Sequence, residues 1–149
     1  MFIVGPVKYA AVLRKEGRAT LAEFPDAPGC QTFAEAGESI EDEARDALTG
    51  WLEAHLVGNR TPPRPRERTP RGNVLWVTVP ARVAVRLSLR WARSDAGLTQ
   101  AQLAKRVGVS QQSIAKLEHP DTNPTLETLE RVAAVLGVDV EIVFRPRAA

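Results

Sequence analysis

Hydrophobic and polar positions alternate in short runs through the first eighty residues, as is typical of β-strands. The runs that are rich in apolar, β-branched and aromatic residues are 9–14, 19–24, 30–33 and 74–79. A polar segment containing Gly17 joins the first two runs, which predicts a β-hairpin. Pro80 ends the last run, because proline cannot continue a central strand.

Between the third and fourth runs, apolar residues repeat at a helical spacing. They occupy one face of a helix, made of Ile40, Ala44, Ala47, Leu48, Trp51, Leu52 and Leu56. Ser39 is a suitable N-cap, and Glu41, Asp42 and Glu43 lie in the first turn, where the helix dipole favours negative charge. This part of the chain therefore predicts a small layer of one antiparallel-type sheet with one helix, within an α+β protein.

After Pro80 the pattern is helical almost to the end, with Gly97, Gly108 and Gly137 as breaks. Residues 138–144 then alternate apolar with acidic side chains, which predicts a terminal strand. Such a strand could pair with a second copy of the chain or join the sheet of its own chain, and the sequence does not decide between them. We expect two domains, residues 1–80 and 81–149, the second an all-α bundle with this possible strand. The tryptophans Trp51, Trp76 and Trp91 are expected in the core.

Residues 60–71 hold four prolines and five arginines, a composition that excludes a helix interior or a central strand. Two interpretations remain open for this Pro/Arg-rich loop, which we place within the first domain. One is an arm that binds nucleic acid, and the other is an extended connection kept soluble by its charge.

Charge is distributed unevenly along the chain. The net charge is −5 for residues 1–59, +4 for residues 60–81 and +3 for residues 82–149, although the total is only +2. With 44% hydrophobic and 26% charged residues the composition is that of a globular protein. An acidic first part favours a cationic partner, and a basic second part favours a polyanion.

Other function classes lack support in the sequence. The single cysteine, Cys30, cannot form an intramolecular disulfide or a zinc cluster, and no apolar run is long enough for a membrane span. His55 and His119 are isolated, and no glycine-rich phosphate loop is present. We therefore expect a cytoplasmic protein without membrane contact, catalytic residues, metal or cofactor.

Residues 99–118 read as two short helices joined by a tight turn. Thr99 and Ser110 are suitable N-caps, and Gly108 supplies the left-handed backbone that the turn needs. The inward positions are the apolar residues Leu103, Val107, Ile114 and Leu117. This is the pattern of a helix-turn-helix.

The outward positions of the second helix are polar: Gln111, Gln112, Ser113 and Lys116. Glutamine amides can bond adenine in the major groove, and lysine reaches guanine or phosphate. Gln100, at the start of the first helix, is placed to meet a phosphate. Spacing alone also permits a helical hairpin that binds no DNA.

Residues 99–136 resemble the five-helix DNA-binding domain of phage repressors and Cro proteins, the Xre-type family, most closely in the stretch Gly108-Val109-Ser110-Gln111-Gln112-Ser113-Ile114. The resemblance implies base contacts from Gln111, Gln112 and Lys116, and a backbone contact from Gln100. It also implies a structural ion pair between Arg93 and Glu118. His119-Pro120 departs from the family, which usually has a small polar residue and glycine there.

The first domain resembles the HicB antitoxin family in its Phe24-Pro25-Asp26-Ala27-Pro28-Gly29-Cys30-Gln31-Thr32 stretch and in the helix entry at 39–44. The resemblance implies a truncated ribonuclease-H-like domain that occludes a small basic mRNA-cleaving toxin, HicA. It further implies a bacterial autorepressor that binds double-stranded operator DNA as a homodimer or higher homo-oligomer and is nucleoid-associated when bound.

Two alternatives remain. One is a stand-alone Xre-type repressor whose first domain senses a small ligand. The other is a ribonuclease-H-like hydrolase tethered to DNA, which would need several carboxylates converging on metal ions, and the sequence shows no such convergence.

Overall fold

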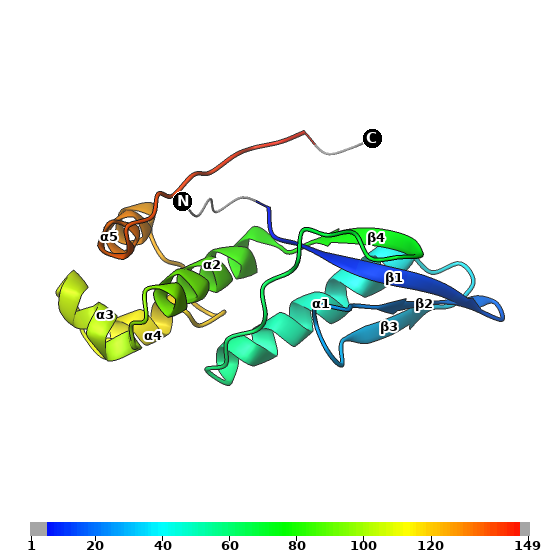
Figure 1. Ribbon diagram of the computed structural model, residues 1–149, viewed down its shortest axis with the longest axis horizontal. Coiled ribbons are helices and arrows are strands. Elements are labelled where there is room, and N and C mark those ends of the chain that lie inside the picture. Colours follow the sequence, from blue (N-terminus) through cyan, green and yellow to red (C-terminus); the bar gives the residue numbers. More distant parts are fainter. Residues whose placement is uncertain (1–5, 147–149) are drawn as a thin grey trace. The chain divides into compact units, whose positions relative to one another are not determined.

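The computed structural model describes residues 6–146, which form two compact units, residues 6–84 and residues 85–146 (Figure 1). The boundary lies within the helix Ala81–Asp95 (α2), which begins in the first unit and ends in the second. The assignment of separate functions to residues 1–80 and 81–149 stays a prediction. In the described part of the chain, no helix is both long and apolar enough to cross a bilayer.

The first unit contains an antiparallel sheet with the strand order β3-β2-β1-β4. Its strands are Lys8–Glu16 (β1), Ala19–Glu23 (β2), Gln31–Ala34 (β3) and Asn73–Thr78 (β4). The predicted hairpin is confirmed: β1 pairs with β2 across a turn in which Gly17 has φ 61°. That backbone conformation favours glycine, which explains the residue at this point of the sequence.

The helix Ile40–Val57 (α1) covers one face of this sheet (Figure 1). Its N-cap is the predicted one, since Ser39 Oγ accepts a hydrogen bond of 3.2 Å from the Asp42 backbone N–H. The helix buries Ala44, Leu48, Leu52 and Leu56, and the sheet face with alternating buried positions carries Tyr9, Ala11, Ala22 and Val77. Each buried leucine contributes about 1.5–3 kcal/mol.

The opposite face of the sheet carries large side chains in contact with solvent. The register pairs Ala10 with Trp76 and Leu21 with Phe33, and Trp76 and Phe33 are 38% and 55% exposed. The expectation that Trp76 lies in the core is therefore wrong. Alternation assigns side chains to two faces, but α1 covers only one of them.

The Pro/Arg-rich loop is attached to the first unit. Pro62 is fully buried, and the Tyr9 hydroxyl donates a hydrogen bond of 2.8 Å to the Pro63 carbonyl. The Asp26 carboxylate accepts from Arg66 twice, from the backbone N–H at 2.8 Å and from Nε at 2.6 Å. The loop is thus anchored to the unit at Pro62, Pro63 and Arg66, while most of its other residues are exposed.

The second unit is helical, and α2 is followed by Gln100–Val107 (α3), Gln111–Leu117 (α4) and Leu126–Leu136 (α5). Their shared core consists of Leu89, Leu103, Ala104, Ile114, Leu129 and Val132. An α+β protein with an antiparallel sheet in front and helices behind is confirmed. Within the described residues after Pro80 there are four helices, where the resemblance implied five.

The terminal strand is not formed in the single chain. Residues 138–146 run extended after Gly137 without regular structure (Figure 1). Ile142, Val143 and Phe144 are exposed, while Val140 packs against the helical core. Within the single chain these residues have no neighbouring strand for their backbone hydrogen bonds, because the regular elements of residues 85–146 are all helices. Pairing with a second copy stays a prediction.

Candidate nucleic-acid interface

The turn between α3 and α4 is fixed by caps at both helices. Thr99 and Gln102 form a capping box at the start of α3, and Gly108 ends that helix with φ 84°. Ser110 then caps α4, since its hydroxyl accepts from the Ser113 backbone N–H at 3.2 Å. These local signals hold the start of α4 in one orientation.

The outward face of α4 is polar and accessible. Gln111, Gln112, Ser113 and Lys116 are all exposed, whereas Ile114 on the inner side is 1% exposed. The Ser113 hydroxyl lies 2.9 Å from the Ser110 hydroxyl, so it also belongs to the cap. The structure therefore brings four of the five residues predicted to meet DNA onto one helix surface.

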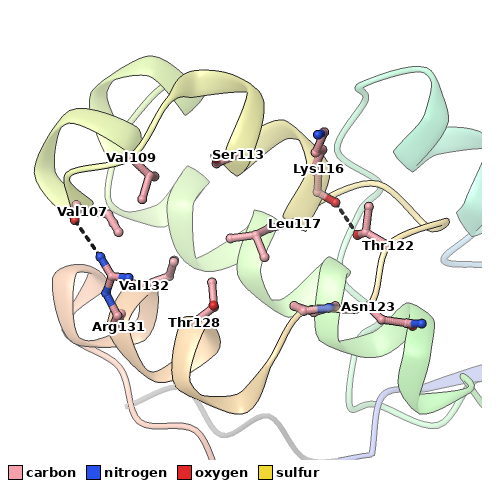
Figure 2. A pocket seen from close by; sticks show the side chains of 11 residues that line it. Val107, Val109, Ser113, Lys116, Leu117, Thr122, Asn123, Thr128, Arg131 and Val132 are labelled. Atoms are coloured by element: carbon pink, nitrogen blue, oxygen red, sulfur yellow. Dashed lines mark hydrogen bonds between the residues drawn. The ribbon is translucent and has the colours of Figure 1, made fainter.

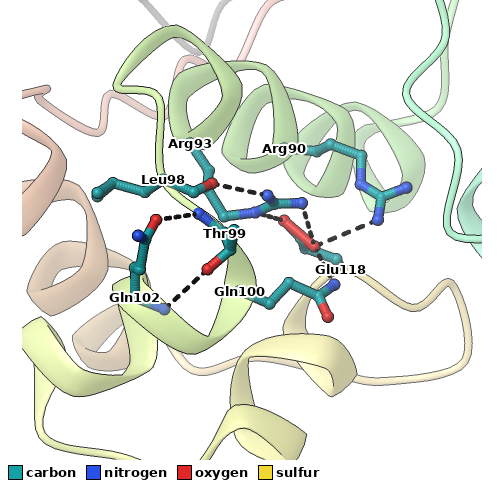
Figure 3. A network of polar contacts seen from close by, with 7 residues as sticks. All are labelled: Arg90, Arg93, Leu98, Thr99, Gln100, Gln102 and Glu118. Carbon is teal, nitrogen blue, oxygen red and sulfur yellow. Dashed lines mark hydrogen bonds and ion pairs between the residues drawn. The ribbon is translucent and has the colours of Figure 1, made fainter.

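Figure 3 shows a buried polar network behind this surface. Arg93 Nε and Glu118 Oε1 are 2.6 Å apart, and Arg93 Nη2 and Glu118 Oε2 are 3.1 Å apart. Arg93 Nη1 also donates to the Leu98 carbonyl at 2.9 Å. The pair that the family resemblance implied is thus bidentate, and it joins α2 to the residue that ends α4.

Gln100, the fifth residue predicted to meet DNA, points into the same network (Figure 3). Its Nε2 donates to Glu118 Oε2 at 2.6 Å, and the side chain is half-buried. In the free protein this amide orients Glu118 and ties the start of α3 to the end of α4. Its contact with a phosphate stays a prediction.

Arg90 is a member of the network that sequence reasoning missed. It is 1% exposed, and its Nη2 lies 3.5 Å from Glu118 Oε2. Burial lowers the pKa of Arg90, and the Glu118 carboxylate acts in the opposite direction. The available signal was its spacing of three residues from Arg93 on α2, which places both side chains on one helix face.

The unusual His119-Pro120 sequence is held through the backbone. Arg86 Nε donates to the His119 carbonyl at 2.5 Å, and Thr122 Oγ1 donates to the same oxygen at 3.0 Å. Thr122 Oγ1 also donates to the Lys116 carbonyl. These bonds fix the loop after α4 where the family usually has a glycine.

An open pocket of about 290 Å³ lies beside α4 (Figure 2). Its wall combines Lys116 on α4 with Asn123, Thr128 and Arg131 from the following loop and from α5. Arg131 Nη2 lies 3.5 Å from the Val107 carbonyl. Tertiary folding brings these polar groups next to the predicted DNA-facing residues, and no local motif indicated that they would be neighbours.

The first unit presents acidic groups on the outer side of α1. Asp42 and Asp46 are exposed, and Arg45 lies 3.3 Å from Asp42. Glu53 pairs with Arg82 at 2.6 Å. Among the described residues, no group of three or more histidines, cysteines or carboxylates is arranged to hold a metal ion.

The stretch that resembles HicB antitoxins closes a compact loop. Phe24, Ala27 and Cys30 are buried, and backbone hydrogen bonds join Phe24 to Cys30 and Cys30 to Ala27 at 3.2 and 2.9 Å. Burial raises the pKa of the Cys30 thiol to about 11, so the thiol is protonated at neutral pH. The loop holds Asp26 where it binds Arg66, which is a structural task.

Comparisons with known proteins match both parts of the chain. The helix-turn-helix family model HTH_3 matches residues 89–143. Over 137 residues the chain is 30% identical to Antitoxin HicB 1 of Photorhabdus laumondii, covering 91% of this chain and 86% of that protein. It is 25% identical over 124 residues to Antitoxin HicB of Escherichia coli K12, covering 83% and 88% of the two chains. It is 41% identical over 51 residues to the immunity repressor protein of Bacillus phage phi105, covering 34% and 35%.

Proposed function

The chain belongs to the HicB antitoxin family, and from this premise we propose that it neutralises a small basic toxin with its first unit and represses its own operon with its second. The chain is an antitoxin and helix-turn-helix regulator and not an enzyme, because its relatives are antitoxins and transcriptional regulators. The alignment over 91% of the chain carries the proposal. It includes both units, which favours toxin binding over ligand sensing by the first.

The toxin-binding half of the proposal is supported by charge. The net charge of −5 in residues 1–59 suits a basic partner, and Asp42 and Asp46 expose carboxylates on one side of α1. Inhibition would be occlusion, with this unit covering the surface on which a HicA-type ribonuclease holds RNA. Steering by exposed charges weakens at high salt, so we expect association to be slower there.

The DNA-binding half is supported by the exposed polar face of α4. Gln111 and Gln112 can each bond adenine through both amide atoms, and Lys116 can reach guanine or a phosphate. Operator binding as a dimer would place two such helices in successive major grooves, about 34 Å apart. The buried Arg93–Glu118 pair supports this use, because it sets the orientation of α4 from behind.

One experiment addresses each half. For DNA, fluorescence anisotropy measures binding of the full chain to the region upstream of the operon that encodes it, in competition with unrelated DNA. We expect specific binding about 10³-fold or more tighter than non-specific binding. Equal affinity for both DNAs would contradict the repressor role.

For the toxin, the chain is co-expressed with the protein encoded next to it and purified by an affinity tag. We expect the parent chain and a Gln31→Lys control to retain a small basic protein, and the Asp42→Lys/Asp46→Lys variant to retain less. Gln31 is exposed on β3, outside α1. Failure of the parent chain to retain any neighbour-encoded protein would leave a repressor with a ligand-sensing first unit as the better account.

A further inference from the structure

The residues after α5 form one amphipathic extended segment. Its even-numbered positions are all apolar, Val138, Val140, Ile142 and Phe144, and its odd-numbered positions are mostly charged, Asp139, Glu141, Val143 and Arg145. Side chains of an extended chain alternate between two faces, so one face of this segment is wholly apolar. It was this period of two that predicted a strand.

The apolar face begins on the helical core and continues without cover. Val138 and Val140 are half-buried, and Val140 packs against the core of the second unit. Beyond them, Ile142 is 56% exposed and Phe144 is 94% exposed. An edge of unpaired backbone groups beside exposed apolar side chains is a template for another strand.

We propose that residues 139–145 of two copies of the chain pair as an antiparallel ribbon centred on Ile142, and that this ribbon joins two DNA-binding units. This inference specifies how the dimer of the proposed function forms, and it therefore rests on that function. Four pairs follow from the centre: Ile142 faces its own copy, Val140 faces Phe144, Asp139 faces Arg145, and Glu141 faces Val143. The apolar pairs share the face that continues from the core, and the Asp139–Arg145 and Glu141–Val143 pairs lie on the other face.

Self-complementarity selects this register from its neighbours. A ribbon centred on Glu141 would place two glutamates opposite each other, and like charges in that position are destabilising. A ribbon centred on Val143 would pair only residues 141–145 and would bring Pro146, which has no backbone N–H, opposite Val140. Registers that set odd positions opposite even ones would place the whole apolar face of one copy against the mostly charged face of the other.

The ribbon also fits the symmetry that operator binding needs. Two copies that pair through the same segment are related by a two-fold axis, and so are the half-sites of a palindromic operator. The pairing segment follows directly from α5, so each copy would carry its own recognition helix. The same segment of a second copy is thus complementary to the exposed apolar face and can cover it.

A cysteine scan tests the register directly. Ile142→Cys, Glu141→Cys and Val143→Cys are each made in a Cys30→Ala background, oxidised, and separated on a non-reducing gel. Opposite Cα atoms in an antiparallel pair are about 4.5–5.5 Å apart, within the span of a disulfide. We expect a reducible dimer from Ile142→Cys and little from the two neighbours. Stronger cross-linking at position 141 or 143, or none at all three, would overturn the proposal.

A charge exchange tests the same ribbon in solution. Asp139→Arg and Arg145→Asp each place like charges opposite each other twice in the dimer, and the double variant restores opposite charges. Sedimentation measures the dimer dissociation constant without DNA or toxin. We expect each single variant to dimerise on the order of ten-fold more weakly, and the double variant to recover. Unchanged single variants, or a double variant as weak as the singles, would refute the pairing while leaving operator and toxin binding to their own assays.

Discussion

Arg93 and Glu118 lie 25 residues apart in the chain and form a bidentate ion pair, with 2.6 Å between Nε and Oε1. The Glu118 carboxylate is 4% exposed and receives Arg90 and Gln100 as well. One carboxylate therefore joins α2, the start of α3 and the end of α4. The orientation of the predicted recognition helix depends on this buried group.

Replacement of Glu118 should destabilise the second unit strongly. Glu118→Gln leaves the Arg90 and Arg93 guanidinium groups buried without their carboxylate, and loss of one partner of a buried pair costs about 3–5 kcal/mol. Urea unfolding followed by circular dichroism measures the free energy of unfolding. The control Glu130→Gln changes an exposed glutamate of α5 and should shift it by less than about 0.5 kcal/mol. Equal midpoints for both variants would contradict a structural role for the network.

Gln111 should determine sequence preference. Gln111→Ala is expected to cost about 1–3 kcal/mol of operator affinity and to relax discrimination at the contacted base pair, because the amide no longer bonds a base edge. Competition with base-substituted operators measures this discrimination, and Gln112→Ala should act at a neighbouring position. The exposed Gln31 of the first unit supplies the matched control Gln31→Ala. Unaltered affinity and discrimination in both α4 variants would remove these residues from the interface.

Lys116 should contribute to the salt dependence of binding. Each neutralised phosphate adds about 0.9 to the slope of log affinity against log salt, since a counterion is released. Lys116→Gln is therefore expected to reduce that slope by about 0.9, measured by anisotropy between low and moderate salt. A slope equal to that of the parent chain would show that Lys116 does not approach the DNA backbone.

Asp26 should anchor the Pro/Arg-rich loop. Asp26→Ala removes both hydrogen bonds to Arg66, and we expect faster trypsin cleavage within residues 60–71, followed by mass spectrometry. Trypsin should cleave the control Asp46→Ala, which changes an exposed carboxylate of α1, at the same rate as the parent chain. If trypsin cleaved the Asp26 variant no faster than the parent chain, the contacts of Pro62 and Tyr9 alone would account for the position of the loop.

The Cys30 thiol should ionise only at high pH. Folding favours its neutral form, because burial raises the pKa from 9.0 to about 11. The contribution of the buried neutral thiol to the free energy of unfolding is therefore complete below pH 9 and is lost as the pH rises toward 11. Iodoacetamide alkylation measured against pH should reach half its maximal rate near pH 11 in the folded chain and near pH 9 in urea. A folded-state midpoint near 9 would contradict the effect of burial.

Local signals predicted the features that depend on neighbouring residues. Ser39, Thr99 and Ser110 cap helices where expected, and Gly108 takes the left-handed conformation that the turn requires. The backbone groups that these side chains bond lie within a few positions of them, so the caps could be predicted from the local sequence.

Features that depend on distant residues were not predictable in the same way. The hydrogen bond from the Gln100 amide to Glu118, which is 18 residues away, was not predicted. Trp76 fits a strand pattern, yet only the position of α1 decides which face is covered. Residues 138–144 alternate with the period of a strand, but this pattern does not show which neighbouring strand they would pair with.

Growth of a bacterial host shows whether the chain acts as an antitoxin. The protein encoded next to this chain is induced alone, together with the chain, and together with the Asp42→Lys/Asp46→Lys variant. We expect growth arrest with the neighbour alone, full rescue by the chain and weaker rescue by the variant at equal expression. Unimpaired growth on induction of the neighbour alone, or arrest that the intact chain does not relieve, would contradict the antitoxin function.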